Sequence, residues 1–278
     1  MGKKPLFNVF ELFVLLLKYA KLSLKSILEY KFDRTFITIA IVCREMISVV
    51  VMFLILVRFV HIKGWEYNEM FFLYSFLFLS YSIFVLFFAG MRDFAEMIYS
   101  GEFDRVLTRP LGLMYQIIAS KIDLSAGLGH GIVGVILFTK TAFSVGIDWN
   151  IKNIVYYIVI LISGAVIQAS IFLFASCFSF WTVKTDNLRN MIFFNARRFS
   201  GYPISFYPGI IQKLLMFVIP FAFVNYFPAQ FYLNKAEINS FWNGFLYLSP
   251  AVGAIMFVLV YMFWRQGVRH YSSTGTSR

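Results

Sequence analysis

Charged residues, cysteine and histidine are scarce in this sequence, and each shortage excludes a class of protein. Asp, Glu, Lys and Arg make up 14% of the 278 residues, whereas soluble domains have about 25%. The two cysteines, Cys43 and Cys177, lie inside apolar runs, and the three histidines lack the spacing of metal ligands. We therefore expect neither a disulfide framework nor a metal site.

Motifs for energy conversion and catalysis are also missing. The sequence contains no Gly-x-x-x-x-Gly-Lys-Ser/Thr phosphate loop, no His-Glu-x-x-His and no Gly-x-Ser-x-Gly. Its apolar segments do not carry the paired acids and histidines of a proton relay. A membrane-embedded enzyme is therefore disfavoured. If this chain moves a molecule uphill, another polypeptide must supply the energy.

What the sequence has in abundance is apolar side chains. Hydrophobic residues make up 60% of the chain, which includes 35 Phe, and the mean hydropathy is +0.73. A soluble domain has roughly 45–50% and could not hide so much apolar surface from water. The long apolar runs predict an all-α integral membrane protein.

Six apolar runs are long enough to cross a bilayer, which needs about 20 residues per helix. Four of them contain no charged residue, and the other two contain one or two. We therefore predict six transmembrane helices, over residues 35–57, 70–91, 124–147, 153–183, 214–234 and 238–264.

The distribution of basic residues predicts the orientation. With both termini in the cytoplasm, the inner segments hold 19 Lys and Arg and the outer loops hold three. This bias follows the positive-inside rule, and it accounts for the net charge of +11 without a nucleic-acid partner. Residues 265–278 form a cytoplasmic tail. Abundant Phe, Ile, Tyr and Lys suggest an AT-rich bacterial genome and a bacterial plasma membrane.

Residues 1–34 differ from the spans. Their charges recur at helical spacing and form one stripe, opposite apolar positions such as Val9, Phe13 and Ile27. The pattern predicts an amphipathic helix in the cytoplasmic membrane interface, in contact with lipids. A seventh span is the alternative, although three central charges each cost roughly 2.5–3.5 kcal/mol. The charges on the stripe are Glu11, Lys18, Lys21, Lys25 and Glu29.

Three charged residues fall within the predicted spans, namely Arg44, Glu45 and Lys140. Adjacent helical positions point about 100° apart, so we expect Arg44 and Glu45 to pair with different helices or with another subunit. A buried structural pair and a polar lining of a transport path are both open. Lys140 lies near the outer end of its span, where its head group reaches water.

Two spans carry small residues four apart, at Gly127 and Gly131 and at Ala165 and Ala169. Such pairs let helices approach closely in lipid. They predict either a subunit contact or packing within one chain.

The fifth predicted span contains Pro220 and Pro228, with Asn225 between them. Each proline removes a helical hydrogen bond, so we expect a kink and then a break near the outer end. Residues 227–240 would form a partly re-entrant cap near a translocation path, because broken backbone at membrane depth needs a protein or water cover.

The connection over 92–123 holds a short amphipathic stretch. Gly101 ends one helix, Phe103, Val106 and Leu107 share a side, and a helix is expected from Pro110 to near Phe143. The stretch predicts either a solvated loop or a docking element for a cytoplasmic partner.

This connection resembles the signature that follows the second span of type-two ATP-binding-cassette (ABC) exporter permeases. The residues that carry the resemblance are Gly101-Glu102-Phe103-Asp104 to Leu107, then Arg109-Pro110-Leu111, together with Tyr202-Pro203-Ile204-Ser205, Tyr207-Pro208 and Ile219 to Ala229. The chain is most similar to the branch with six spans and an N-terminal amphipathic helix.

The resemblance implies a function and a set of partners. Residues 35–264 would be one half of an exporter membrane domain, and residues 91–111 would be the coupling segment that docks on a separate ATPase. Two ATPase copies and a second permease, favoured to be a different homologous chain, would complete the transporter. ATP and Mg would bind the ATPase, and this chain would hold no cofactor. A stand-alone secondary transporter or channel is the alternative. The coupling residues would be Gly101, Phe103, Asp104, Val106, Leu107, Arg109 and Pro110.

Overall fold

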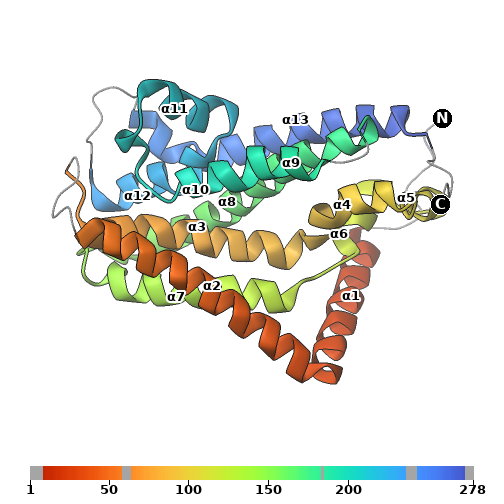
Figure 1. The fold of residues 1–278 in the computed structure, drawn as a ribbon, viewed down its shortest axis with the longest axis horizontal. Coiled ribbons are helices and arrows are strands. Elements are labelled where there is room, and N and C mark those ends of the chain that lie inside the picture. The colour runs from red at the N-terminus through yellow and green to blue at the C-terminus, as the bar shows by residue number, and fades with distance from the viewer. Residues whose placement is uncertain (1–8, 58–63, 183–184, 236–242, 273–278) are drawn as a thin grey trace.

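The computed structural model describes residues 9–57, 64–182, 185–235 and 243–272. Helices dominate these residues, as the composition predicts, and most lie roughly parallel to the long axis of the molecule (Figure 1). The α-helices are α1 (Val9–Glu29), α2 (Lys31–Val57), α3 (Tyr67–Phe87), α4 (Ala89–Tyr99), α5 (Phe103–Thr108), α6 (Leu113–Ala119), α7 (Leu124–Ala142), α8 (Ile151–Cys177), α9 (Asp186–Arg189), α10 (Ala196–Phe199), α11 (Gly209–Lys213), α12 (Tyr226–Leu233) and α13 (Ser249–His270).

Five described helices, α2, α3, α7, α8 and α13, are long and apolar enough to cross a membrane. Helix α3 lies at the centre of the bundle and packs along α7 and α8, while α13 packs on α8 and α2 packs on α7. Helices α4, α5 and α6 gather at one end of the molecule and α12 lies at the other (Figure 1). We call these the α5 end and the α12 end.

Small residues on α7 allow the close packing at the centre. A Cβ atom on Gly127 would lie 3.1 Å from Leu86 of α3, and one on Gly129 would lie 2.7 Å from Ile41 of α2. Ala165 and Ala169 of α8 are fully buried. Of the two roles that the small residues predicted, the structure shows packing within one chain.

Residues 186–201 lie beside α3 and α8. They run antiparallel to α3: near their start, Arg189 Nη1 donates to the backbone oxygen of Arg92, at 3.2 Å. Further along, the guanidinium carbon of Arg197 lies 4.0 Å from the centre of the Tyr81 ring. Part of the segment, Asn190–Asn195, is a π-helix. Because the segment carries several arginines, a search for apolar runs does not detect it.

The apolar stretch that follows is bent. Gly209–Val218 and Phe221–Leu233 meet at 74°, with the break at Pro220. They lie toward the α12 end, where Tyr232 Oη donates to the backbone oxygen of Asn153. The bend at Pro220 agrees with the kink predicted for the fifth span over 214–234. Residues 186–201, which lie against α3, do not form the cytoplasmic loop expected over 184–213. With the bent pair counted as one span, the described residues hold up to six helices that could cross a membrane.

Helix α1 runs across the ends of the spans instead of alongside them (Figure 1). Lys18, Lys21 and Lys25 are exposed on it. This arrangement confirms an N-terminal helix of amphipathic character, and its place in the cytoplasmic membrane interface stays a prediction. The side chains of Val9, Phe13 and Ile27, on the predicted apolar face, lie outside the described part.

Candidate functional site

The candidate site is the turn of chain that joins α4 to α6 at the α5 end. Helix α4 stops at Tyr99, and Gly101 follows with a φ of +74°. L side chains rarely adopt this left-handed conformation, so glycine suits the position. The chain reverses there and starts α5 at Phe103.

An aromatic cluster holds α5 in place. Phe103 is fully buried, and its ring centre lies 5.7 Å from that of Phe94, 6.0 Å from that of Phe180 and 5.0 Å from that of Tyr271. These partners come from α4, from the turn that ends α8 and from the residue after α13. The cluster therefore joins α5 to the ends of two spans.

The predicted docking face of α5 needs a correction. Phe103 and Val106 are buried within this chain, whereas the side chain of Leu107 is 41% exposed. A helix of six residues has only one narrow apolar side, and α5 uses that side for its own packing. Of the three residues, Leu107 alone offers substantial surface to a partner.

Asp104 also turns inward, although the sequence suggested a rim position. Tyr271 Oη donates to Asp104 Oδ1 at 3.1 Å. Burial and the bond to Asp104 raise the pKa of Tyr271 to about 12, so the hydroxyl keeps its proton at neutral pH and remains a donor. The bond adds a polar tie between α5 and the end of α13.

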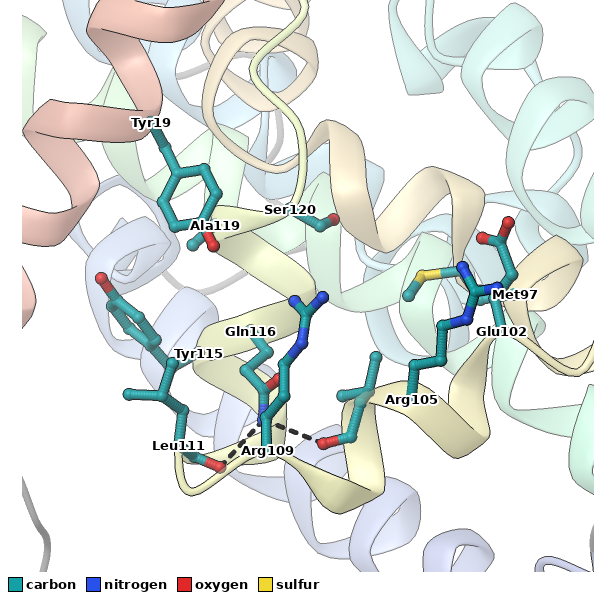
Figure 2. Close-up of a pocket in the computed structure, with 11 residues that line it drawn as sticks. Tyr19, Met97, Glu102, Arg105, Arg109, Leu111, Tyr115, Gln116, Ala119 and Ser120 are labelled. Carbon is teal, nitrogen blue, oxygen red and sulfur yellow. Dashed lines mark hydrogen bonds between the residues drawn. The ribbon is translucent and has the colours of Figure 1, made fainter.

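The loop after α5 is closed by a glutamine that the sequence analysis missed. Gln116 Nε2 donates to the backbone oxygens of Val106, at 3.1 Å, and Leu111, at 3.0 Å (Figure 2). Arg109 and Pro110 lie in this loop, with Arg109 beside the cavity that Gln116 also lines. In the sequence, Gln116 stands out only as a polar residue in an apolar stretch. The fold is needed to show which carbonyl groups its amide meets.

The helix predicted from Pro110 to Phe143 is interrupted. Helix α6 starts at Leu113 and ends at Ala119, and α7 starts at Leu124. Asp123 Oδ1 accepts from the backbone N–H of Ala126 at 3.1 Å and caps α7. A side-chain cap of this kind satisfies a donor that the first helical turn leaves free.

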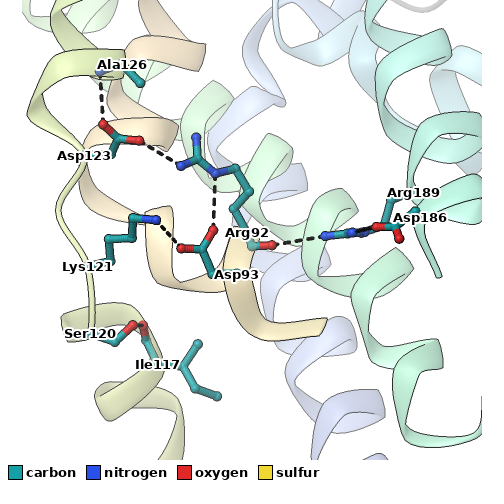
Figure 3. A network of polar contacts seen from close by, with 9 residues as sticks. All are labelled: Arg92, Asp93, Ile117, Ser120, Lys121, Asp123, Ala126, Asp186 and Arg189. Carbon is teal, nitrogen blue, oxygen red and sulfur yellow. Dashed lines mark hydrogen bonds and ion pairs between the residues drawn. The ribbon is translucent and has the colours of Figure 1, made fainter. Parts of the chain in front are cut away.

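Ion pairs brace the same end of the molecule (Figure 3). Arg92 Nη2 lies 2.8 Å from Asp123 Oδ2, and Lys121 pairs with Asp93. Burial alone would lower the pKa of Arg92, but the hydrogen bond and charge of Asp123 raise it above its usual value. The bridge to Arg189 extends the network from α4 to α9. Sequence reasoning missed these contacts because the two ion pairs join residues 31 and 28 positions apart and the hydrogen bond joins residues 97 apart.

The charged residues inside the spans are arranged differently from the prediction. Arg44 Nη2 lies 2.7 Å from Glu45 Oε1, so the two neighbours pair with each other. A long arginine side chain can curl back along its own helix, which the 100° argument overlooks. His130 Nδ1 of α7 lies 3.6 Å from the same carboxylate oxygen. Lys140 is exposed in the last turn of α7.

The prolines of the predicted fifth span differ in their effect. Pro220 lies at the 74° bend, as a kink requires. Pro228 is in the first turn of α12, where its missing N–H is not needed, so the break expected there does not occur. Asn225 is fully buried and its Nδ2 donates to the backbone oxygen of Ser200 at 2.6 Å. This bond ties the start of α12 to the end of the 186–201 segment.

Comparison with known proteins gives one finding. A family model described as "ABC-2 family transporter protein" matches residues 42–275. The match starts inside α2 and extends past α13, so it includes the candidate site but not α1. Neither the curated proteins nor the solved structures give a match.

The burial of Phe103 generates a prediction about stability. Phe103→Ala removes the centre of the aromatic cluster and should destabilise the protein by about 3–5 kcal/mol. Leu107→Ala on the exposed side of the same helix should change stability by less than about 1 kcal/mol. Thermal unfolding of both variants in detergent checks this, and equal losses would contradict the described packing.

Proposed function

The chain belongs to the ABC-2 transporter family, and from that premise we propose that it is the permease subunit of an ATP-driven exporter. Its ATPase would be a separate chain, present in two copies, which binds the ATP and Mg. The absence of a phosphate loop from this sequence supports this division of labour. The observation that carries the proposal is α5, a short helix at the end of the bundle with one side buried and Leu107 exposed.

The contacts of α5 allow it to transmit a movement of the ATPase to the ends of α8 and α13. An ATPase that displaces Leu107 would move a helix anchored to the end of α8 through Phe180 and to the end of α13 through Tyr271. Protein interiors are close-packed and transmit strain. In this proposal the coupling segment includes Gly101 for the turn, the Phe103 cluster for transmission and Leu107 for contact.

The exposed surface of α2 supports a second permease. Only 22% of the most apolar stretch of α2 is buried. Arg44 lies at the middle of this helix, and its side chain is 66% exposed. A charge at that depth needs a protein or a water-filled cavity beside it. We propose that α2 faces a second, homologous permease across a translocation path, with Arg44 and Glu45 at that boundary.

We further propose that the α5 end faces the cytoplasm of a bacterium. The lysines of α1 and the basic residues at the end of α13 lie at that end, in keeping with the positive-inside rule. The chain would contact membrane lipids and proteins but no nucleic acid.

Docking is tested by a charge at the exposed position. Leu107→Glu should lower the affinity for the ATPase by about 2 kcal/mol, roughly thirtyfold, because burial of one leucine contributes about that much. Copurification of an ATPase with the tagged permease is the measurement. Ile151→Glu, an exposed aliphatic residue at the α12 end, is the matched control and should leave copurification intact. Equal effects of the two variants would favour a stand-alone transporter.

Topology is tested by labelling in intact cells. In a Cys43→Ser background, which removes an exposed cysteine, Asn150→Cys should react with an impermeant thiol reagent. Ser100→Cys should react only after the cells are opened. The opposite pattern would reverse the orientation.

A further inference from the structure

A groove separates α1 from the α5–α6–α7 region. It consists of two adjoining cavities, of about 220 and 240 Å³, which share Tyr19, Ala119 and Ser120 in their walls. Tyr19 of α1 forms one side of both cavities, and α5, α6 and the chain before α7 form the other. Figure 2 shows Tyr19 of α1 and, on the other wall of the first cavity, Tyr115 of α6 with Arg105 and Arg109.

The groove carries an excess of positive charge. Arg105 and Arg109 line the first cavity, and Arg34 and Lys121 line the second. Lys121 pairs with Asp93. Within the described residues, the other three cations have no carboxylate within ion-pair distance.

Acidic groups in the groove do not offset these cations. Glu102 lines the first cavity, and Asp123 lines the second. Asp123 is already paired with Arg92 and caps α7. The balance favours an anionic occupant, and arginine binds phosphate oxygens with two parallel hydrogen bonds.

The position of α1 indicates where the groove lies relative to the membrane. This helix crosses the ends of the spans, with Lys18, Lys21 and Lys25 exposed. Tyrosines such as Tyr19 are typical of the membrane–water interface. The side chain of Leu22, which lines the second cavity, is 63% exposed and offers apolar surface beside the charges.

We propose that this groove binds the head group of an anionic phospholipid of the inner leaflet. The phosphate pairs with Arg105 and Arg109, and an acyl chain runs toward Leu22 and the membrane. An acidic segment of a partner protein is the competing occupant. The lipid is favoured because α1, an interfacial helix, forms a wall of both cavities. The site lies against the loop between α5 and α6, so an occupied groove holds α1 against these two helices.

The test measures lipid retention on the full-length chain. The protein is purified in mild detergent and examined by native mass spectrometry with phosphatidylglycerol, phosphatidylcholine or inorganic phosphate added separately. We expect phosphatidylglycerol to bind most tightly. The R105Q/R109Q double variant should weaken it about thirtyfold, because each arginine near an anionic surface contributes about a fivefold factor. Arg269→Gln, an exposed arginine at the end of α13, is the control and should leave binding unchanged.

A charge-preserving variant and four outcomes test the proposal further. Arg109→Lys, which retains the charge, should lose less than Arg109→Gln. Equal binding of phosphatidylcholine, or unchanged phosphatidylglycerol binding in R105Q/R109Q, overturns the proposal. If inorganic phosphate occupies the site as tightly as the lipid, the occupant is a free anion and the lipid assignment is wrong. If the double variant loses only the ATPase, the arginines contact a protein.

Discussion

The packing of Phe103 is the contact on which the arrangement of the α5 end depends. This one side chain touches rings from α4, from the end of α8 and from the end of α13. Its burial determines which side of α5 is left exposed, and hence that Leu107 is available to a partner. The bond between Tyr271 and Asp104 and the two bonds of Gln116 close the loop on either side. An exposed helix of six residues could not hold one position without these contacts.

In the membrane region, different interactions hold the helices together. In lipid, apolar side chains gain little by meeting each other, so helices associate through close packing and polar contacts. Glycines of α7 provide the close packing, and buried bonds such as that from Gln168 Nε2 to Ser80 Oγ, at 2.8 Å, provide the polar contacts. The α2 surface lacks this cover and presents Arg44, which is why we assign it to a second permease. The proposed coupling to the ATPase thus rests on the packed cluster around Phe103, and the proposed second permease rests on the exposed face of α2.

Much of the architecture could be predicted from the sequence, because long uncharged runs have few alternatives to membrane helices. The run over 70–91 covers most of α3 and the start of α4, and the charged stripe lies on α1, which runs across the span ends. Residues 186–201 were expected in a cytoplasmic loop because Arg189 and Arg197 interrupt them, and hydropathy does not show that protein surrounds these side chains. At the candidate site, the pattern located α5 but not its orientation. Phe103 and Leu107 are four positions apart and belong to the same predicted apolar side, so the sequence does not show which of them is buried. The partners supplied by α8 and α13 decide this. The pairing of Arg44 with its neighbour depends on a rotamer, which no residue pattern reports.

The central claim is that α5 and the end of α13 move as one body when the ATPase acts. Spin labels at Thr108→Cys, the exposed last residue of α5, and at the exposed Arg269→Cys allow their separation to be measured by pulsed electron resonance in the assembled transporter without knowledge of the substrate. Cys43→Ser removes the exposed native thiol. The account predicts one narrow distance distribution that stays the same in the nucleotide-free and ATP-bound states. A distribution that broadens or shifts on ATP binding would show that α5 moves independently of α13 and would contradict it.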